Sequence, residues 1–494
     1  MTGRSHAAGP ARGGMTRLAA LDSDALWSAV LSAAAGSRAG AAGVVAEQCT
    51  TAGSARLGWA SPPPWSAVRQ SVAAVQAALN VPAGAEVVLL GTGGWCFAVR
   101  ALIETTGGSA GLTTLDSLDP AAIEQVLAAG AGASRGVLAV SGSGATLETR
   151  RLAEAVPPRG GGRLVWLRDE GAPPDTFPLS PRGGPDQVAM LGAPLSTAFL
   201  AAAAVVDGAA LAAAYPRFLA RHHRIGAAAA RHAVAVPPEG TPRLRFVVPP
   251  WAGPGLRRWL LQLGRQVLGG KPGGFRPTVE LQSTVEVAPA GVDADPPDVV
   301  LDLGGLRRDL PALLDGLYAA GVFVASVGLR AGLGVADHAN VRVYKERLAH
   351  PDPDDPSCPP VAAADLPGAA SAWLASRPEL ARLHVVGYWS DAERNIPPAG
   401  QFAAATGRPC EVHEGSAWNH HSFQAVYPDP TVAVLIVTRG AETDVGAAPP
   451  DRAAARTLRR IAAATHRSLP GRSLLVPLAT ADRAEFPTVL TGGG

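Results

Sequence analysis

Two serines alternate with two glycines directly after an apolar run in residues 136–150, which read GVLAVSGSGATLETR. Gly142 and Gly144 allow a tight turn with backbone N–H groups pointing inward, and Ser141 and Ser143 add hydroxyl donors. A helix that starts near Thr146 adds the positive end of its dipole. The pattern predicts a site for an oxyanion such as a phosphate group. The alternative is an ordinary strand–helix turn capped by a serine.

The elements that would position this turn are a strand at 137–140 and a helix after Thr146. Similar units surround it. They comprise strands at 86–90, 113–116 and 163–167 and helices at 97–104 and 121–129, with Pro120 at the favoured first position of the last helix. Strands that alternate with helices of this length predict a parallel sheet covered on both faces.

A second series follows a Pro-rich linker at 236–242, and helices at 18–37 and 65–79 precede both series. The second series has predicted strands at 243–248, 297–303 and 321–327 and a helix at 255–268. Strands at 383–389 and 431–438 and a helix at 452–466 form either a smaller α/β domain or an extension of the second sheet. We therefore expect an α/β fold with two doubly wound parallel-sheet subdomains (αβα sandwiches), a helical leader and a C-terminal α/β extension. The expected parts are 1–75, 76–235, 236–350 and 351–494.

Composition limits the class of protein. The 494 residues carry a net charge of +2, and only 5% of them are aromatic, so the chain lacks the basic, aromatic surface expected of a nucleic-acid partner. The four cysteines are widely spaced and form no CxxC pair, which favours a reducing, cytoplasmic location. The N-terminus lacks an apolar signal region. The most apolar stretch, 195–215, is interrupted at Asp207-Gly208, so we expect a buried helix there and no membrane partner.

Eight segments, in order along the chain, resemble motifs of the phosphoglucose isomerase family, which has the sugar-isomerase (SIS) fold. They are also similar to the isomerase half of bacterial transaldolase–phosphoglucose isomerase fusions. The segments are RLGW at 56–59, VVLLGTGG at 87–94, TLDSLDPAAI at 114–123, VSGSGATLET at 140–149, FPLSPRGG at 177–184, WLLQLGRQVLGGKPGG at 259–274, DHANVRVYK at 337–345 and HHSFQ at 420–424.

The resemblance implies a sugar-phosphate substrate, no cofactor, and a homodimer. By position, Ser141, Ser143 and Thr146 fall on the family's phosphate ligands. His420 falls on the histidine that helps to open the sugar ring, and Lys345 on the lysine near the ring oxygen. An imidazole suits this step because it gains and loses a proton near neutral pH. The remaining implied substrate-binding residues are Gly93, Gly94, Trp95 and Arg182.

Several positions depart from the family pattern. Gln266 stands where the family has its proton-shuttling glutamate, and an amide cannot take a proton from carbon. Pro185 stands where an arginine stabilises the enediolate, although Arg182 is nearby. Trp95, Gly142 and Ala145 replace a serine, a lysine and a threonine. Glu280 and Glu148 are alternative bases. The resemblance therefore predicts the fold more firmly than the reaction.

Three functions remain open: an aldose–ketose isomerase with a substitute base, a diverged enzyme on a sugar phosphate or related polyol or carbonyl compound, and a non-catalytic sugar-phosphate-binding protein. We expect no metal. The alternative is a site at Cys410, His413, His420 and His421, although its spacing lacks the paired signature of zinc sites.

Overall fold

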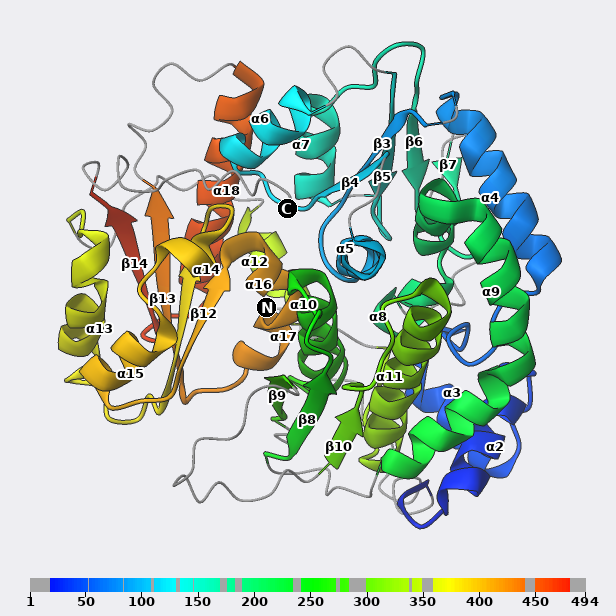
Figure 1. Cartoon of the computed structure of the whole chain (residues 1–494). Coiled ribbons are helices and arrows are strands. Elements are labelled where there is room, and N and C mark those ends of the chain that lie inside the picture. Colours follow the sequence, from blue (N-terminus) through cyan, green and yellow to red (C-terminus); the bar gives the residue numbers. More distant parts are fainter. Residues whose placement is uncertain are drawn as a thin grey trace, which may run out of the picture.

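Three separate parallel sheets organise the computed structural model of the chain (Figure 1). The structure describes all residues except 1–17, 52, 83, 108–110, 130–133, 145, 169–175, 183–188, 234–240, 272–275, 284–298, 337–339, 349–358, 440–448 and 480–494. A short antiparallel pair, β1 (Thr50–Thr51) and β2 (Ser54–Ala55), lies in the leader. The strands that matter for function all belong to the parallel sheets.

The first sheet has the strand order β4-β3-β5-β6-β7. Its strands are β3 (Glu86–Leu90), β4 (Leu112–Leu115), β5 (Arg135–Val140), β6 (Leu164–Leu167) and β7 (Thr176–Phe177). Val87 and Leu89 face one hydrophobic core, while Val88 and Leu90 face another, so the sheet is buried on both sides. This confirms the predicted α/β class with parallel strands.

Helices before and between these strands also match the prediction, with shifts of a few residues at their ends. They are α2 (Ser23–Ala34), α4 (Trp65–Leu79), α5 (Gly94–Thr106), α6 (Pro120–Ala128) and α7 (Leu147–Ala155). Helix α3 (Gly40–Gln48) was not predicted. The Asp119 side chain accepts a hydrogen bond from the Ala121 N–H, and Pro120 opens the helix, as predicted.

The second sheet has the order β10-β8-β9, with β8 (Arg243–Val248), β9 (Thr278–Ser283) and β10 (Val299–Asp302). β9 was not predicted. Helix α10 (Pro254–Gln262) continues directly into a π-helical turn, Leu263–Leu268. Alternate residues of β8 are buried, whereas Arg243 and Arg245 project from the other face and pair with Glu280.

The predicted strand at 321–327 is wrong, because these residues lie inside helix α11 (Leu310–Arg330). A short apolar run rich in valine fits a buried strand and a buried helix equally well. The decision is made by tertiary packing, since α11 is buried on nearly all sides and is capped by the Asp309 side chain. It packs along α9 (Thr197–His232), which is broken at Asp207 as the sequence indicated.

Helices α9 and α11 are both long and apolar enough to cross a membrane, judged by length and composition alone. The most apolar part of α11 is 83% buried inside the protein, against 50% for α9. Each packs on the other and contributes to the same core, which is typical of central helices in a globular protein.

The last third of the chain forms its own sheet and does not extend the second one. The order is β12-β11-β13-β14, with β11 (Arg382–Gly387), β12 (Cys410–Glu414), β13 (Val432–Arg439) and β14 (Ser473–Leu478). The remaining helices are α8 (Ala189–Gly192), α12 (Val341–Leu348), α13 (Leu366–Leu374), α14 (Ala392–Asn395), α15 (Ala399–Thr406), α16 (Gly415–His421), α17 (Phe423–Val426), α18 (Pro449–Ser468) and the 3-10 turns Ala193–Leu195 and Ala363–Asp365.

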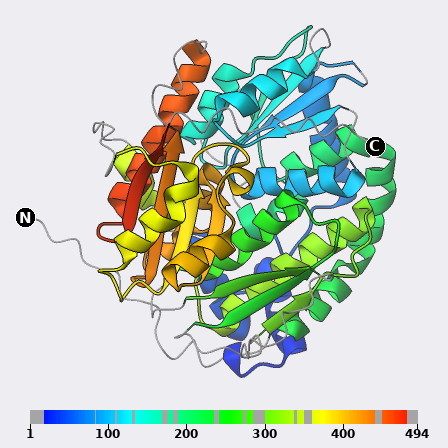
Figure 2. The ribbon, with the colours of Figure 1, turned by 60° about the vertical axis from the view of Figure 1, so that its left-hand side comes forward.

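The three sheets share their cores. The first and second sheets bury side chains in one cluster, and the first and third sheets meet in another that includes α18. Each sheet falls within one of the parts predicted at 76–235, 236–350 and 351–494, which we retain as proposed domains. Helices α5 and α10 pack together where the sheets converge (Figures 1 and 2).

Candidate functional site

The predicted oxyanion loop connects β5 to α7. The Ser141 hydroxyl donates to Thr146 Oγ1 over 2.8 Å, and the Thr146 N–H donates to Ser141 Oγ over 3.4 Å. Ser141 is buried, while Ser143 is exposed at the tip. Gly144 has φ +65°, a left-handed conformation that glycine adopts without strain. The loop is therefore a tight, internally bonded turn that ends at Thr146, the N-cap of α7.

Arg168 lies against this loop and was not among the predicted site residues. A Cβ atom on Gly144 would lie 2.6 Å from Arg168 Nη1, so the guanidinium packs directly over the glycine. Arg168 follows the last residue of β6, the strand beside β5. Because the carboxyl ends of parallel strands share an edge, this position could have suggested a partner for the loop. Arg168 therefore supplies a positive charge at a loop in which Gly142 replaces the lysine of the family motif.

The second glycine loop follows β3 and ends at Gly93, the N-cap of α5. Gly93 has φ 79° and ψ −153°, a conformation that is essentially confined to glycine. A Cβ atom there would lie 3.2 Å from His420 Nδ1 and 3.4 Å from Gln262 Nε2. Gly94 and Trp95 form the buried first turn of α5, and the Trp95 side chain belongs to the hydrophobic core.

Substitution of Gly93 by alanine should destabilise the protein and misplace His420. Gly84 provides a matched control, because it has the same φ of +79° but no neighbour within 4 Å of an added methyl group. We expect both variants to lose about 1 kcal/mol of unfolding free energy from strain and Gly93→Ala to lose at least about 1 kcal/mol more from crowding. Chemical denaturation measures both; equal losses would contradict the close packing.

His420 and Glu148 form a buried pair across the first and third sheets. His420 lies in the last turn of α16, and Glu148 lies in the first turn of α7; Nε2 and Oε1 are 3.6 Å apart. Burial is the largest single influence on the pKa of Glu148 and raises it, but His420, the Glu148 backbone N–H and the Lys345 charge together lower this pKa. Glu148 is 2% exposed, so its charge has little access to water. Of the two alternative bases, Glu148 lies beside His420, whereas Glu280 is held by Arg243 and Arg245.

Gln262 and Gln266 approach the same place from one side of α10 and its π-helical extension. The Gln262 amide N–H donates to Gln266 Oε1. Both residues are buried, at 3% and 8% exposure. Gln266 therefore lies one hydrogen bond away from the Gln262 amide that packs against Gly93. Gln266, predicted at the family's base position, thus lies close to Gly93 and His420, with an amide in place of a carboxylate.

Four buried polar atoms in the second glycine loop and the groups beyond it have no hydrogen-bond partner among the described residues, although two of them, Glu148 Oε1 and His420 Nε2, face each other as the ion pair at 3.6 Å. They are Thr92 Oγ1, Glu148 Oε1, Gln262 Oε1 and His420 Nε2. Such atoms are rare in folded proteins, because each costs the free energy of its lost hydration. A concentration of them at one junction is what a site for a polar ligand would leave when empty. We call these four residues, with Gly93, the junction site.

Two predicted site residues lie apart from the junction site. Lys345 is exposed on α12. Its charge helps to lower the pKa of Glu148, but less than His420 and the Glu148 backbone do. Arg182 donates to Ser61 Oγ at 3.1 Å and to the Pro62 carbonyl at 2.8 Å, so it ties its segment to the leader. Pro185, the departure from the family arginine, and Ala145 lie outside the described residues.

The structure brings together a different set of potential metal ligands from the one considered in the sequence. His384, Glu411 and His413 have ligand atoms within 4.8 Å of one another. However, Arg265 Nη2 contacts both Glu411 oxygens at 2.7 Å, and the Trp418 N–H donates to His384 Nδ1 at 3.0 Å. A histidine that accepts at Nδ1 carries its proton on Nε2 when neutral and cannot also bind metal there.

The cysteine of the earlier set fits a metal no better. Burial, followed by the nearby Glu411 charge, raises the pKa of Cys410 to about 12, so the group remains a thiol at neutral pH. Metals bind the thiolate. The Cys410 Sγ instead donates to the Glu411 carbonyl over 3.7 Å. In this structure Glu411 is thus engaged by Arg265, and Cys410 is a protonated thiol that faces a backbone carbonyl.

No protein-family model and no curated protein matches the sequence. Solved structures of other proteins share part of its architecture. The chain is similar to sugar-phosphate isomerases. Glucose-6-phosphate isomerase from Chlamydia trachomatis D/UW-3/Cx is 15% identical, with 61% of this chain and 76% of that chain covered and a TM-score of 0.39. Tagatose-6-phosphate ketose/aldose isomerase from Escherichia coli is 15% identical, with 44% and 60% covered and a TM-score of 0.26.

A hypothetical protein from Thermus thermophilus is also similar, at 17% identity. The match covers 66% of this chain and 95% of that chain, with a TM-score of 0.46. Likenesses of this extent describe the arrangement of helices and strands.

Proposed function

We propose that this chain binds a sugar phosphate, or a related polyol or carbonyl compound, and acts on it as a diverged relative of phosphoglucose isomerase. The observation that carries the proposal is the junction site, where Thr92 Oγ1 and Gln262 Oε1 lack hydrogen-bond partners among the described residues and Glu148 Oε1 and His420 Nε2 have only their ion pair. The β5–α7 loop, with Ser141, Ser143 and Arg168, would hold the phosphate group. Loop and junction site are linked by α7, which carries Glu148 in its first turn after the loop.

In the proposed reaction, His420 and Glu148 act as a unit. Opening a sugar ring moves a proton between the ring oxygen and the anomeric hydroxyl, and an imidazole can carry that proton. Glu148 would stabilise the charged imidazole, because it is buried and lies 3.6 Å away. Gln266 cannot move the carbon-bound proton that isomerisation requires. Ring opening without the later C2-to-C1 transfer is therefore the step that these residues support.

A second candidate is an aldose–ketose isomerase that uses Glu148 as its base. It is favoured by one observation: Glu148 is the carboxylate that the described residues place beside His420, and its low pKa keeps it ionised. A third, the non-catalytic sugar-phosphate-binding protein, would use the same loop. Turnover of bound fructose 6-phosphate separates the two enzymes from the binding protein.

Binding of fructose 6-phosphate, with unphosphorylated fructose for comparison, tests the proposed phosphate loop. We expect Arg168→Gln to weaken fructose 6-phosphate binding about tenfold or more, because a charge-assisted hydrogen bond is lost. Isothermal titration calorimetry measures this effect. Arg217→Gln is the matched control, since Arg217 is an exposed arginine on α9. Equal affinities for the two sugars, or equal effects of the two substitutions, would contradict the proposal.

A further inference from the structure

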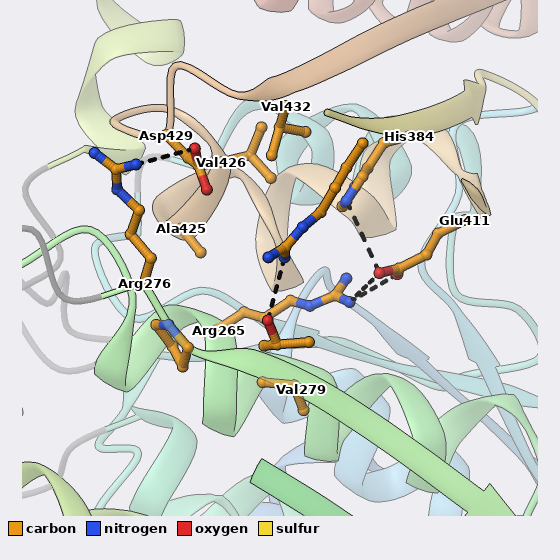
Figure 3. Close-up of a pocket in the computed structure, with 12 residues that line it drawn as sticks. Arg265, Arg276, Val279, His384, Glu411, Ala425, Val426, Asp429 and Val432 are labelled. Carbon is orange, nitrogen blue, oxygen red and sulfur yellow. Dashed lines mark hydrogen bonds and ion pairs between the residues drawn. The ribbon is translucent and has the colours of Figure 1, made fainter. Parts of the chain in front are cut away.

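A cavity beside the π-helical turn is distinct from the junction site and unexplained by the function proposed above. Figure 3 shows it between the second and third sheets. Arg265 comes from the π-helical turn, Thr278 from β9, and Arg382, His384 and Glu411 from β11 and β12. The cavity has a volume of about 40 Å³, enough for a small ion and too small for a sugar phosphate.

The charged side chains around this cavity do not balance. Arg265, Arg276 and Arg382 supply three positive charges, while Glu411 and Asp429 supply two negative ones. One positive charge therefore remains. Arg276 and Glu411 keep 34% and 43% of their side chains exposed, so water screens part of this excess, but the net positive charge would still attract an anion into the cavity.

The three arginines differ in how far the protein already satisfies them. Arg265 is engaged by both Glu411 oxygens at 2.7 Å and by Ser422 Oγ at 2.8 Å. Arg276 has one long contact, 3.4 Å, to Asp429 Oδ1. That oxygen also accepts bonds from the backbone N–H and the hydroxyl of Thr431. The Arg276 guanidinium therefore keeps most of its donors for another partner.

Arg382 is the least satisfied of the three. Its Nη1 donates to the neutral hydroxyl of Thr278 over 3.2 Å. In the part of the chain that the structure describes, no carboxylate lies within ion-pair distance of Arg382. A guanidinium has five N–H donors in a planar fork that suits the oxygen atoms of phosphate. Arg382 thus presents a positive charge to the cavity with donors to spare.

His384 adds a neutral donor to the same wall. Because Nδ1 accepts the Trp418 N–H, the proton of the neutral ring lies on Nε2. Burial lowers the pKa of His384 to about 3, so the ring is neutral at physiological pH. Nε2 is 3.9 Å from Glu411 Oε1, which is too far for a hydrogen bond. His384 is 5% exposed, so this N–H is a fixed donor in a buried wall.

We propose that this cavity binds a small oxyanion, of which inorganic phosphate is the simplest, through Arg276, Arg382 and the Nε2–H group of His384. One anion of single charge would neutralise the excess charge. Glu411 stays paired with Arg265 and so does not compete for these donors. The site is independent of the β5–α7 loop, and neither proposal requires the other.

Calorimetric titration of the full chain with inorganic phosphate tests this site, with Arg168→Gln present to weaken the loop. In that background we expect Arg382→Gln and Arg276→Gln each to weaken the remaining phosphate binding about tenfold or more. Arg217→Gln, in the same background, should leave it unchanged. Circular dichroism confirms that each variant is folded, and the two cavity variants report on one site independently.

The outcomes separate the two proposals. If phosphate binding in the Arg168→Gln background is absent, or equals that of the Arg382→Gln and Arg276→Gln variants, the cavity is not an anion site. If Arg168→Gln has no effect while the cavity substitutions abolish binding, the cavity stands and the loop proposal fails. If sulfate competes with phosphate at the cavity, the specificity is for the shared tetrahedral oxyanion, as the three donors imply.

Discussion

Replacing Gln266 with glutamate should raise the interconversion of glucose 6-phosphate and fructose 6-phosphate about 100-fold or more over a very weak wild-type rate. A positioned general base typically contributes a factor of about 10² to 10⁴. The local structure can accept the change, because the Gln262 N–H that donates to Gln266 Oε1 would donate equally well to a carboxylate. A coupled assay that detects the product isomer measures the rate.

Gln266→Met is the control for this experiment, since methionine has a similar length and cannot take a proton. It should not increase the rate. Wild-type turnover comparable to that of an ordinary isomerase would contradict the diverged reaction. If Glu148→Gln then abolished that turnover, Glu148 would be identified as the substitute base. If the wild type and Gln266→Glu bind fructose 6-phosphate but neither converts it nor opens its ring, the chain is a binding protein.

Removing His420 should cost about 3 kcal/mol or more of unfolding free energy at neutral pH, because His420→Leu leaves the Glu148 carboxylate buried without its partner. The pair is well shielded, with side-chain exposures of 11% for His420 and 3% for Glu148. Chemical denaturation of the full chain measures the loss. The double variant Glu148→Gln/His420→Leu should recover much of it, because no charge then remains buried.

This loss should depend on pH in a defined direction. In the wild type the pKa of Glu148 is lowered, so its contribution to stability is present above the ordinary carboxyl value and is lost as the pH falls. Without His420, burial is the largest remaining influence and raises that pKa. The stability of His420→Leu should then fall, relative to the wild type, as the pH rises from about 5 to about 7. A difference that is constant with pH, or a double variant no more stable than His420→Leu, would contradict the pairing.

The two glycine loops show how much of the site a sequence can predict. Both follow short apolar strands and begin helices, and both adopt these structures in the protein. Their partners come from distant segments. The contact of Arg168 with Gly144 joins the ends of two neighbouring strands, and the contact of His420 with Gly93 joins two different sheets. The position of Arg168 directly after β6 indicated the edge of the sheet on which it lies, but only the folded chain shows that its guanidinium packs on Gly144.

The sequence by itself determined much of the local structure of the first sheet: the strands β3 to β6, the helix start at Asp119 and Pro120, and the turn of the 136–150 loop. These features depend on neighbouring residues, through backbone conformation and capping. Tertiary structure decided that residues 321–327 are helical and that Glu148 faces His420. It also decided that the third sheet is separate. Burial and the meeting of distant charges are properties of the packed chain, because they depend on which segments lie together.

The loop at 136–150 illustrates the boundary between the two. Its residues alone predict a turn able to hold an anion. Only the folded chain supplies Arg168 beside Gly144 and aligns Glu148, in the helix that follows, with His420. Each of these partners follows the carboxyl end of a parallel strand, Arg168 directly after β6 and His420 in the helix after β12.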